Sequence, residues 1–261
     1  MKNILYFCIF VVIAILSCAD DGGGGGGGDG TVAGKGGSMA RFAIKDDYLY
    51  IVSLDSLKIF NIENAAHPRY TPERNLKIGF DIETIFPMGS LLFIGARTGM
   101  YVYDISVPQF PMRLSQVVHF RSCDPVVAQG DYAYVTLNTN ASGCGPIPNN
   151  VLEIYNVSNP LKPELKRTVT LNGPTGLGVD GAKQKLFVCD LGLKVYDISD
   201  PKNISQVDDH IDIVEVDIRA AYDVIPVQKS ELLILVAKEG LFQFDYSGDK
   251  LKFVSRILIK K

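Results

Sequence analysis

Beyond residue 37, short apolar strings alternate with polar turns, and no stretch of ten residues shows the 3.6-residue period of a helix. Each string is five or six residues long, rich in Val, Ile, Tyr and Phe, and bounded by Gly, Asp, Asn, Ser or Pro. This pattern is typical of β-strands. The most regular strings, each of which predicts one strand, occupy residues 48–52, 91–95, 132–136, 185–189 and 232–236.

These strings recur because the chain repeats one unit five times. A second apolar string follows each of them; the clearest is Leu193-Lys-Val-Tyr-Asp-Ile-Ser-Asp-Pro201, and the others span residues 57–64, 100–108, 152–160 and 241–248. A short apolar strand before the pair and a more polar strand after it complete each unit. The first such strand is expected at residues 40–44 and the last at residues 251–259.

Four strands in about 45 residues is the size of a propeller blade. A lone blade has two apolar faces and can bury neither, whereas blades side by side in a closed ring bury both. The central strands of each unit are apolar at successive positions, as strands covered on both faces require. We therefore predict an all-β fold for residues 38–261, a five-bladed β-propeller of four-stranded antiparallel blades whose ring is closed.

In each of the five units, an Asp or Asn follows the aromatic residue of the second string. We expect each of these side chains to close an Asx turn by accepting a hydrogen bond from the backbone two residues on, a structural role. The five residues are Asn61, Asp104, Asn156, Asp197 and Asp245.

The repeat unit resembles a known family. Val-Tyr-Asp-Ile-Ser-Asp-Pro at 195–201, Arg-Ser-Cys-Asp-Pro-Val-Val at 121–127 and Gly-Asp-Tyr-Ala-Tyr-Val at 130–135 are similar to LVIVD repeats of bacterial secreted and surface proteins. The resemblance covers essentially residues 38–261. It departs from the family mainly in the first and fifth units, where the proline after the Ser-containing turn is missing. It implies a β-propeller and no enzymatic activity that can be carried over.

The N-terminus predicts export. Lys2 precedes thirteen apolar residues, 4–16, which suit a signal peptide and fall short of the ~20 that span a bilayer. Ile15-Leu16-Ser17-Cys18 resembles the lipobox of bacterial lipoproteins, in which the cysteine is acylated. The resemblance implies a lipoprotein signal peptide at residues 1–17 and lipidation of Cys18. Ordinary secretion and an uncleaved anchor are the alternatives.

Residues 18–37 are dominated by Gly and predict a flexible, lipidated tether, with an r.m.s. span of about 20 to 25 Å. Asp20 and Asp21 resemble the acidic signals that send some lipoproteins to the outer face of the outer membrane. We therefore expect a chain anchored by lipid to the outer membrane and exposed at the cell surface; the periplasmic face is the alternative.

Three cysteines lie within the repeats. Cys123, in a link between two units, and Cys144, in a long loop of the third unit, fall at the same end of a four-stranded meander, so we expect a disulfide between them. By closing a loop, this disulfide would stabilise the folded chain by about 3 kcal/mol. Unrelated thiols or a metal pair are the alternatives. Cys189 lies within a strand and is expected to be a buried free thiol.

Candidate chemistry gathers at the expected mouth of the central channel, where the first strand of each unit begins. Alignment of the units places Ala40, Glu83, Asp124, Thr175 and Asp223 there. Glu83, Asp124, Thr175 and Asp223 are thus a possible ligand or cation site. The plainer explanation of these side chains is that they are solvated turn residues and caps. A role in glycoside processing rests on analogy between folds alone. Loops at the same end present a mixed polar set, namely Asp55, Ser56, Arg97, Thr98, Asn138, Asn140, Asp190, Lys238 and Glu239.

Several functional classes lack support. The net charge of -3, without a basic run, argues against a nucleic-acid partner. His67, His119 and His210 stand alone, and no nucleophile elbow, phosphate loop or zinc spacing is present, so we expect no enzyme activity, cofactor or metal. The sequence thus predicts a membrane-anchored lipoprotein whose propeller is a non-catalytic binding or scaffold module for a protein or glycan partner. The alternative is a glycan-binding protein or glycoside-processing enzyme that uses the acidic mouth.

Overall fold

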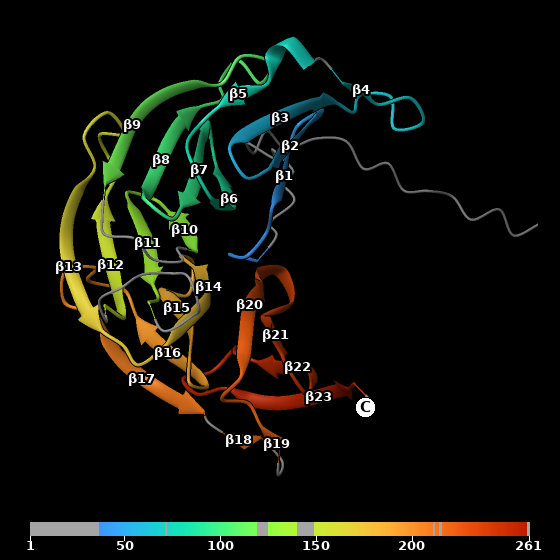
Figure 1. Cartoon of the computed structure of the whole chain (residues 1–261). Helices are drawn as coiled ribbons and strands as arrows, with labels where there is room; N and C mark the ends of the chain where they lie inside the picture. The colour runs from blue at the N-terminus through green and yellow to red at the C-terminus, as the bar shows by residue number, and fades with distance from the viewer. Residues whose placement is uncertain are drawn as a thin grey trace, which may run out of the picture. The chain divides into compact units, whose positions relative to one another are not determined.

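The computed structural model describes residues 37–70, 72–118, 125–139, 149–210, 212–213 and 216–259. They form five blades of antiparallel strands, so the predicted five-bladed all-β propeller is confirmed (Figure 1). Blade 1 contains β1 (Phe42–Lys45), β2 (Tyr48–Val52), β3 (Ser56–Asn61), β4 (Arg69–Tyr70) and β5 (Leu76–Lys77). Blade 2 contains β6 (Ile82–Met88), β7 (Leu91–Ala96), β8 (Gly99–Asp104) and β9 (Met112–Val118).

Blades 3 to 5 follow the same plan. Blade 3 contains β10 (Val126–Gln129), β11 (Tyr132–Leu137), β12 (Val151–Asn156) and β13 (Glu164–Thr170). Blade 4 contains β14 (Pro174–Asp180), β15 (Lys185–Asp190), β16 (Leu193–Asp197) and β17 (Ser205–His210). Blade 5 contains β20 (Ala221–Val227), β21 (Leu232–Ala237), β22 (Gly240–Asp245) and β23 (Lys252–Leu258). The minor elements are η1 (Pro72–Arg74), η2 (Gln228–Ser230) and the pair β18 (Asp212–Ile213) and β19 (Val216–Asp217).

The strands of blades 2 to 5 pair in sequence order, as β1 to β4 do in blade 1, and the first strand of each blade lies innermost (Figure 1). Successive blades pack through these inner strands: β1 contacts β6, β6 contacts β10, β10 contacts β14, and β14 contacts β20. The innermost strands therefore surround a common hub, and the residues that begin them are brought together there.

The five predicted Asx turns are confirmed. In every blade the Asp or Asn Oδ1 accepts a hydrogen bond from the backbone N–H two residues on, over 2.7 to 3.2 Å. Just before this turn, the third strands of blades 2 to 5 carry a register shift, as between Val102 and Tyr103. Because a bulge increases local twist, its repetition gives these blades a common shape.

Blade 1 departs from the plan in its fourth strand. Where the other blades have one outer strand of six or seven residues, blade 1 has the two-residue strands β4 and β5, both paired with β3 and separated by η1. Pro72, the first residue of η1, has no N–H to donate to a sheet, which accounts for the break.

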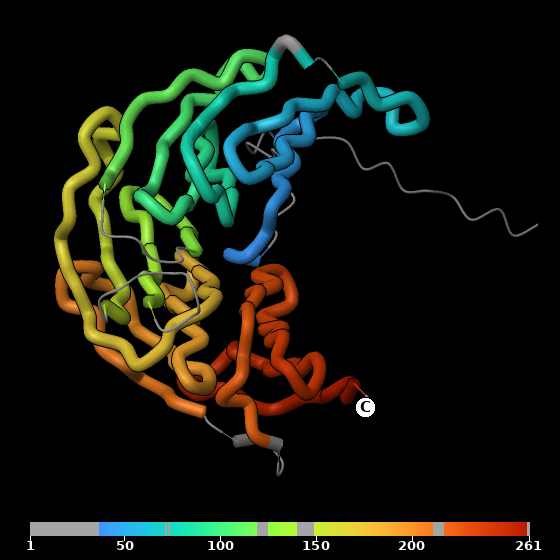
Figure 2. Tube along the Cα trace, in the orientation of Figure 1, coloured from blue at the N-terminus to red at the C-terminus, as the bar shows by residue number. Residues whose placement is uncertain are grey.

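The central strands of the inner blades and of the end blades differ in how many of their residues are buried. In β7, β11 and β15 five successive residues are buried, because both faces of blades 2 to 4 are covered. In β2, β21 and β22 buried residues alternate with partly exposed ones, so blades 1 and 5 are each covered on one face only. The described blades therefore form an open arc, and the expectation of a closed ring was wrong. Figure 2 shows its two ends closest at the hub and diverging outward.

Among the residues described, no helix is long and apolar enough to span a membrane. The predicted signal peptide at 1–17 and lipidation site at Cys18 lie outside the described residues.

Candidate functional site

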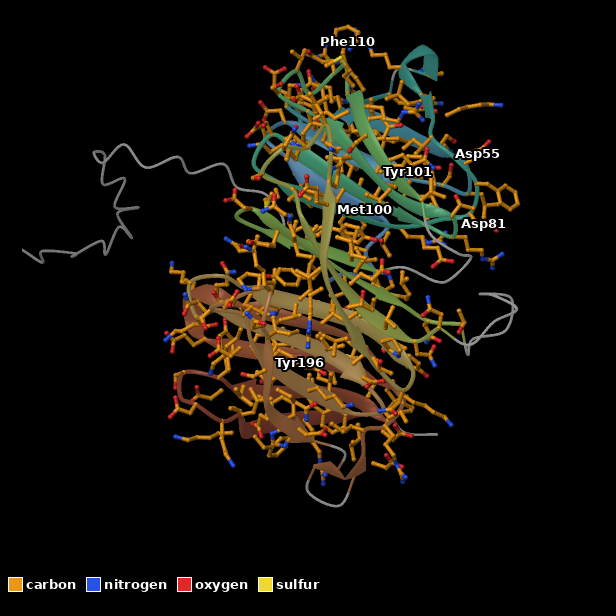
Figure 3. The ribbon with its side chains drawn as sticks, turned by 90° about the vertical axis from the view of Figure 1, so that its left-hand side faces the viewer. Asp55, Asp81, Met100, Tyr101, Phe110 and Tyr196 are labelled. Atoms are coloured by element: carbon orange, nitrogen blue, oxygen red, sulfur yellow. The ribbon has the colours of Figure 1, made fainter. Side chains whose placement is uncertain are left out.

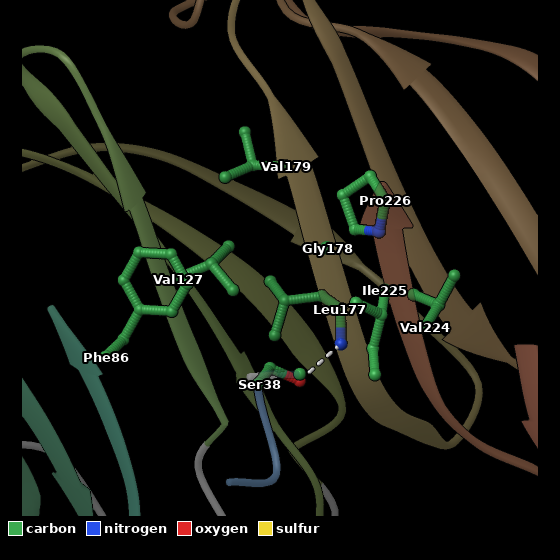
Figure 4. A pocket seen from close by; sticks show the side chains of 10 residues that line it. Ser38, Phe86, Val127, Leu177, Gly178, Val179, Val224, Ile225 and Pro226 are labelled. Atoms are coloured by element: carbon green, nitrogen blue, oxygen red, sulfur yellow. Dashed lines mark hydrogen bonds between the residues drawn. The ribbon is translucent and has the colours of Figure 1, made fainter. Parts of the chain in front are cut away.

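A short N-terminal segment, residues 37–41, crosses the hub; we call it the hub segment. Ser38 Oγ donates a hydrogen bond to Asp223 Oδ1 of blade 5 at 2.9 Å. The Leu177 N–H of blade 4 donates to Ser38 Oγ at 2.7 Å (Figure 4). The Ile85 N–H of blade 2 donates to the Ala40 carbonyl at 3.0 Å. Five residues thus connect blades 2, 4 and 5 with blade 1, and the hub segment ties the arc together at its centre.

Glycines make room for this contact. A Cβ at Gly37 or at Gly176 would collide with the carboxylate of Asp223. A Cβ at Gly178 would come within 2.7 Å of the Val224 carbonyl, so this position allows β14 and β20 to approach backbone to backbone. The remaining space beside Ser38 is a cavity of about 20 Å³, the size of one water molecule.

The carboxylate of Asp223 is occupied by hydrogen bonds at the hub. Its partial burial raises the pKa of its carboxyl above the ordinary 3.8, while hydrogen bonds from Ser38, Met39 and Val224 act in the opposite direction. Because both carboxylate oxygens already accept hydrogen bonds from the chain itself, Asp223 serves to hold the hub segment.

Thr175 is a structural residue as well. Its hydroxyl donates to the Ala221 carbonyl of blade 5 at 2.8 Å, and its own carbonyl accepts from Thr136 Oγ1 of blade 3 at 2.9 Å. Asn138 adds a bond from its side-chain amide to the Pro174 carbonyl at 2.5 Å. These side chains connect neighbouring blades around the hub.

A cavity of about 330 Å³, which we call the hub cavity, lies beside the hub segment. It is lined by Met39, Arg41, Glu83, Pro125, Asn138, Pro174 and Thr175. Glu83 lies 3.9 Å from Arg97 Nε, while Arg97 Nη1 forms a 2.7 Å ion pair with Asp81 Oδ2. The cavity thus combines a basic, an acidic and an amide side chain with apolar walls, and its volume lies within the usual range of small-molecule sites.

The structure brings only part of the predicted site together. Glu83 and Thr175 line the hub cavity, whereas Asp223 faces the hub segment. Asp124 lies outside the described residues, as do Cys123 and Cys144, so their predicted disulfide stays a prediction. Throughout the described ranges, no group of three or more His, Cys, Asp or Glu side chains is placed to hold a metal ion.

The polar loop set is also divided. Of this set, Asp55 lies at the same end of the blades as Asp81, the ion-pair partner of Arg97 (Figure 3). Asp190 is fully buried instead, and accepts hydrogen bonds from the N–H groups of Asn172 and Gly173 and from Lys194 Nζ. It caps the connection between blades 3 and 4 from within, so it is not part of a recognition surface.

The structure shows the surroundings of Cys189 and of His210. Cys189 is a buried free thiol, as predicted, and burial raises the pKa of its thiol. His210, which was expected to stand alone, has Nε2 3.0 Å from Asp208 Oδ2. His119 lies outside the described residues.

Sequence reasoning missed Ser38, Met39 and Arg41. Alignment of the units matched Ala40 with Glu83, so the neighbours of Ala40 were not counted at the mouth. The signal was present, because Ser38 and Arg41 are the first polar side chains after Gly37, the last residue of the glycine-rich segment. Nothing in the repeat shows, however, that a segment preceding the first strand crosses the hub.

The fold and its hub define a β-propeller, and residues 36–71 match the LVIVD repeat family. The chain therefore carries an LVIVD repeat in its first blade. This is one of the two blades in which the sequence departs most from the family's turn pattern, so recognition of the repeat does not depend on the turn proline. No curated protein matches the chain in sequence.

Solved structures share the fold at low identity. A functionally unknown protein from Desulfotomaculum acetoxidans is 16% identical with a TM-score of 0.59, covering 81% of this chain and 68% of its own. A protein from Lactobacillus plantarum is 10% identical with a TM-score of 0.61, covering 83% and 67%. The periplasmic gluconolactonase of Pseudomonas aeruginosa is 12% identical with a TM-score of 0.57, covering 82% and 68%. At these identities the likeness shows the fold alone, and this chain spans about two thirds of each structure.

Proposed function

We propose that this chain is a lipoprotein anchored in the outer membrane and exposed at the cell surface, whose propeller is a non-catalytic binding module. The observation that carries the binding role is the hub cavity, about 330 Å³ in volume, with Arg41, Glu83 and Asn138 around apolar walls. A few polar groups in a mostly apolar concavity provide orientation and specificity for a ligand. The ligand is a glycan or a peptide segment of a partner protein.

The state of the two described carboxylates of the predicted mouth, Glu83 and Asp223, supports binding over catalysis. Glycoside hydrolysis needs two carboxyl groups free to act on the substrate, one as acid and one as base or nucleophile. Asp223 is held by Ser38, Met39 and Val224, and Glu83 lies beside Arg97. Both groups therefore have structural partners where an acid–base pair would need to face a ligand.

Binding is tested with glycan and peptide arrays probed with the full chain and with variants. Arg41→Ala and Asn138→Ala should weaken retention of any array hit about tenfold or more, since both residues line the cavity. Lys229→Ala is the control, because Lys229 lies in η2, outside the cavity lining. Equal retention by all variants would place recognition elsewhere. Turnover of a glycoside that Glu83→Gln abolishes would instead establish the enzymatic alternative.

Anchoring is tested separately, because it rests on the sequence of residues 1–37. Cys18→Ala should release the chain from the membrane fraction, and protease added to intact cells should digest the wild type. Retention of Cys18→Ala in membranes would refute the lipid anchor. Protection of the wild type from protease would refute surface exposure while leaving the anchor in place.

A further inference from the structure

One charged side chain at the hub cavity has no partner. The cavity is bordered by residues at the beginnings of the inner strands β1, β6, β10 and β14. Arg41, the residue before β1, is exposed, and its guanidinium has no hydrogen-bond or ion-pair partner among the described residues. A guanidinium offers five N–H donors in one plane. Arg41 is therefore positioned to hold a polar group of a ligand.

The other polar side chains of the lining are engaged by the protein itself. Asn138 donates to the Pro174 carbonyl at 2.5 Å, and the Thr175 hydroxyl donates to a blade 5 carbonyl at 2.8 Å. Glu83 Oε1 lies 3.9 Å from Arg97 Nε. A ligand with many hydroxyl groups would leave several of them unpaired on binding, which costs free energy. The lining thus favours a ligand with one strongly polar group.

The rest of the lining is apolar. Pro125 and Pro174 have no backbone N–H to offer a ligand. The Met39 side chain is 46% exposed, so a ligand that covers it removes apolar surface from water. A thioether side chain also adapts to apolar groups of different shapes. These walls therefore suit the apolar body of a ligand.

The charges at the cavity limit the ligand to a single negative charge. Arg97 lies between two carboxylates, since it forms a 2.7 Å ion pair with Asp81 and also lies beside Glu83. Arg41 supplies the second positive charge, so the formal charges of these four side chains cancel. One anionic group can pair with Arg41, whereas a second negative charge would face Glu83 across the cavity. A phosphate monoester, which carries a charge of about -1.5 to -2 at neutral pH, is therefore disfavoured.

A carboxylate meets these requirements, because its two oxygens match the planar fork of a guanidinium. We propose that the hub cavity binds a monocarboxylate with an apolar body, an inference that rests on the binding role proposed above. The carboxylate pairs with Arg41, and the apolar body packs against Met39, Pro125 and Pro174. Such a ligand is either the C-terminus of a peptide that ends in an apolar residue or a free carboxylic acid.

The test is saturation-transfer difference NMR on the full chain in detergent, with empty micelles as the blank. The probes are N-acetylleucine and 4-methylpentanoate, which share the carboxylate and the apolar body, and the amides of both. Each acid should bind with a dissociation constant of about 1 mM, and each amide about tenfold more weakly or worse, because it has no charge for Arg41. Tighter binding of N-acetylleucine assigns the ligand to a peptide C-terminus. Equal or tighter binding of 4-methylpentanoate assigns it to a free acid.

Variants of the two charged lining residues should act in opposite directions. Arg41→Ala should weaken binding of both acids about tenfold or more, because it removes the ion pair. Glu83→Gln should tighten binding about threefold, because it removes a like charge from the wall. The matched control is Arg167→Ala in β13, an exposed arginine on the outer strand of blade 3 and outside the cavity lining. It should leave the dissociation constants unchanged.

Other outcomes would overturn the proposal. Equal binding of acid and amide contradicts it, as do equal binding by wild type and Arg41→Ala, the reverse pair of effects, or no saturable binding of either acid up to about 20 mM. An array ligand that needs Arg41 and Asn138 but no carboxylate would remove this inference and leave the binding role in place. A denaturation midpoint close to wild type verifies that each variant is folded. If Arg41→Ala fails this check, Arg41→Gln makes the same test.

Discussion

Ser38 Oγ lies 2.9 Å from Asp223 Oδ1, and this hydrogen bond joins residues 185 positions apart. It connects the start of the described chain to the first strand of the last blade. Because Ser38 Oγ also accepts the Leu177 N–H, one buried hydroxyl serves blades 4 and 5 at once. The end blades of the arc do not cover each other. This contact at the hub therefore holds blade 5 to the segment that precedes blade 1, a connection that packing between the first and last blades provides in a closed ring.

Ser38→Ala should therefore destabilise the fold. The substitution removes a donor to a carboxylate and an acceptor for a buried N–H, and an unsatisfied buried group costs about 1 to 3 kcal/mol. Urea denaturation of the wild type and variant gives the difference in the free energy of unfolding. Ser230→Ala is the control, because its hydroxyl bonds to Val227 at an exposed turn. A loss no larger than that of the control would show that the hub segment contributes little to stability.

Asp223 gives this contact a pH dependence. Its pKa is raised in the folded state, so the folded chain binds more protons than the unfolded chain between pH 3.8 and the folded pKa. Stability attributable to this group is therefore present in full below pH 3.8 and falls as the pH rises through that window. We expect wild type to lose stability relative to Asp223→Asn as the pH is raised from about 4. Urea denaturation of both proteins at several pH values measures this, and a difference that does not vary with pH would contradict the raised pKa.

Gly176 should not tolerate a side chain. A Cβ at this position would meet the Asp223 carboxylate and come within 2.7 Å of the Tyr222 carbonyl. Backbone on one side cannot move without separating β14 from β20, and overpacking of this kind costs about 1 to 3 kcal/mol or more. Gly176→Ala should lower the thermal midpoint, measured by circular dichroism. Gly248→Ala, with open space around its Cβ, should not; equal shifts would refute the close approach.

The repeat predicted the local structure well. The string 48–52 is β2, and the strings 91–95, 132–136, 185–189 and 232–236 each form the second strand of a blade with one further residue. The Asx turns at residues such as Asp104 and Asp197 also follow the prediction. Both depend on interactions within a few residues, namely apolar alternation and the reach of a short side chain to its own backbone, and a sequence states these directly.

Closure of the ring and the make-up of the candidate site depend on how neighbouring blades pack. The sequence of the repeat does not specify this packing. The angle between neighbouring blades arises from how whole faces pack, so five units predicted a closed ring where the end blades stand apart. The same limit applies to the mouth. Aligned positions suggested that Glu83 and Asp223 share a role, yet Glu83 lines the hub cavity whereas Asp223 binds Ser38 from outside the repeat.

A second buried contact joins blades 4 and 5, at the opposite end of β14 from Gly176. Tyr246 Oη donates to Asp180 Oδ2 at 2.8 Å, and Asp180 Oδ1 accepts from the backbone N–H of Ala182 and of Lys183. Tyr246 is fully buried and Asp180 is 1% exposed. Burial and the nearby carboxylate both raise the pKa of the Tyr246 hydroxyl, which keeps it protonated as the donor.

Tyr246→Phe should cost about 1.5 to 3 kcal/mol of unfolding free energy, because it removes a hydrogen bond to a buried charged group while keeping the ring that packs on Phe187. Chemical denaturation at neutral pH measures the loss. Tyr70→Phe is the matched control, since the Tyr70 hydroxyl accepts a bond from Asn75 at an exposed site. If Tyr246→Phe and Tyr70→Phe lose the same amount, the Tyr246–Asp180 bond does not hold blade 5 to blade 4. A larger loss in Tyr246→Phe, with an unchanged slope against denaturant, would show that the two blades unfold together with the rest of the arc.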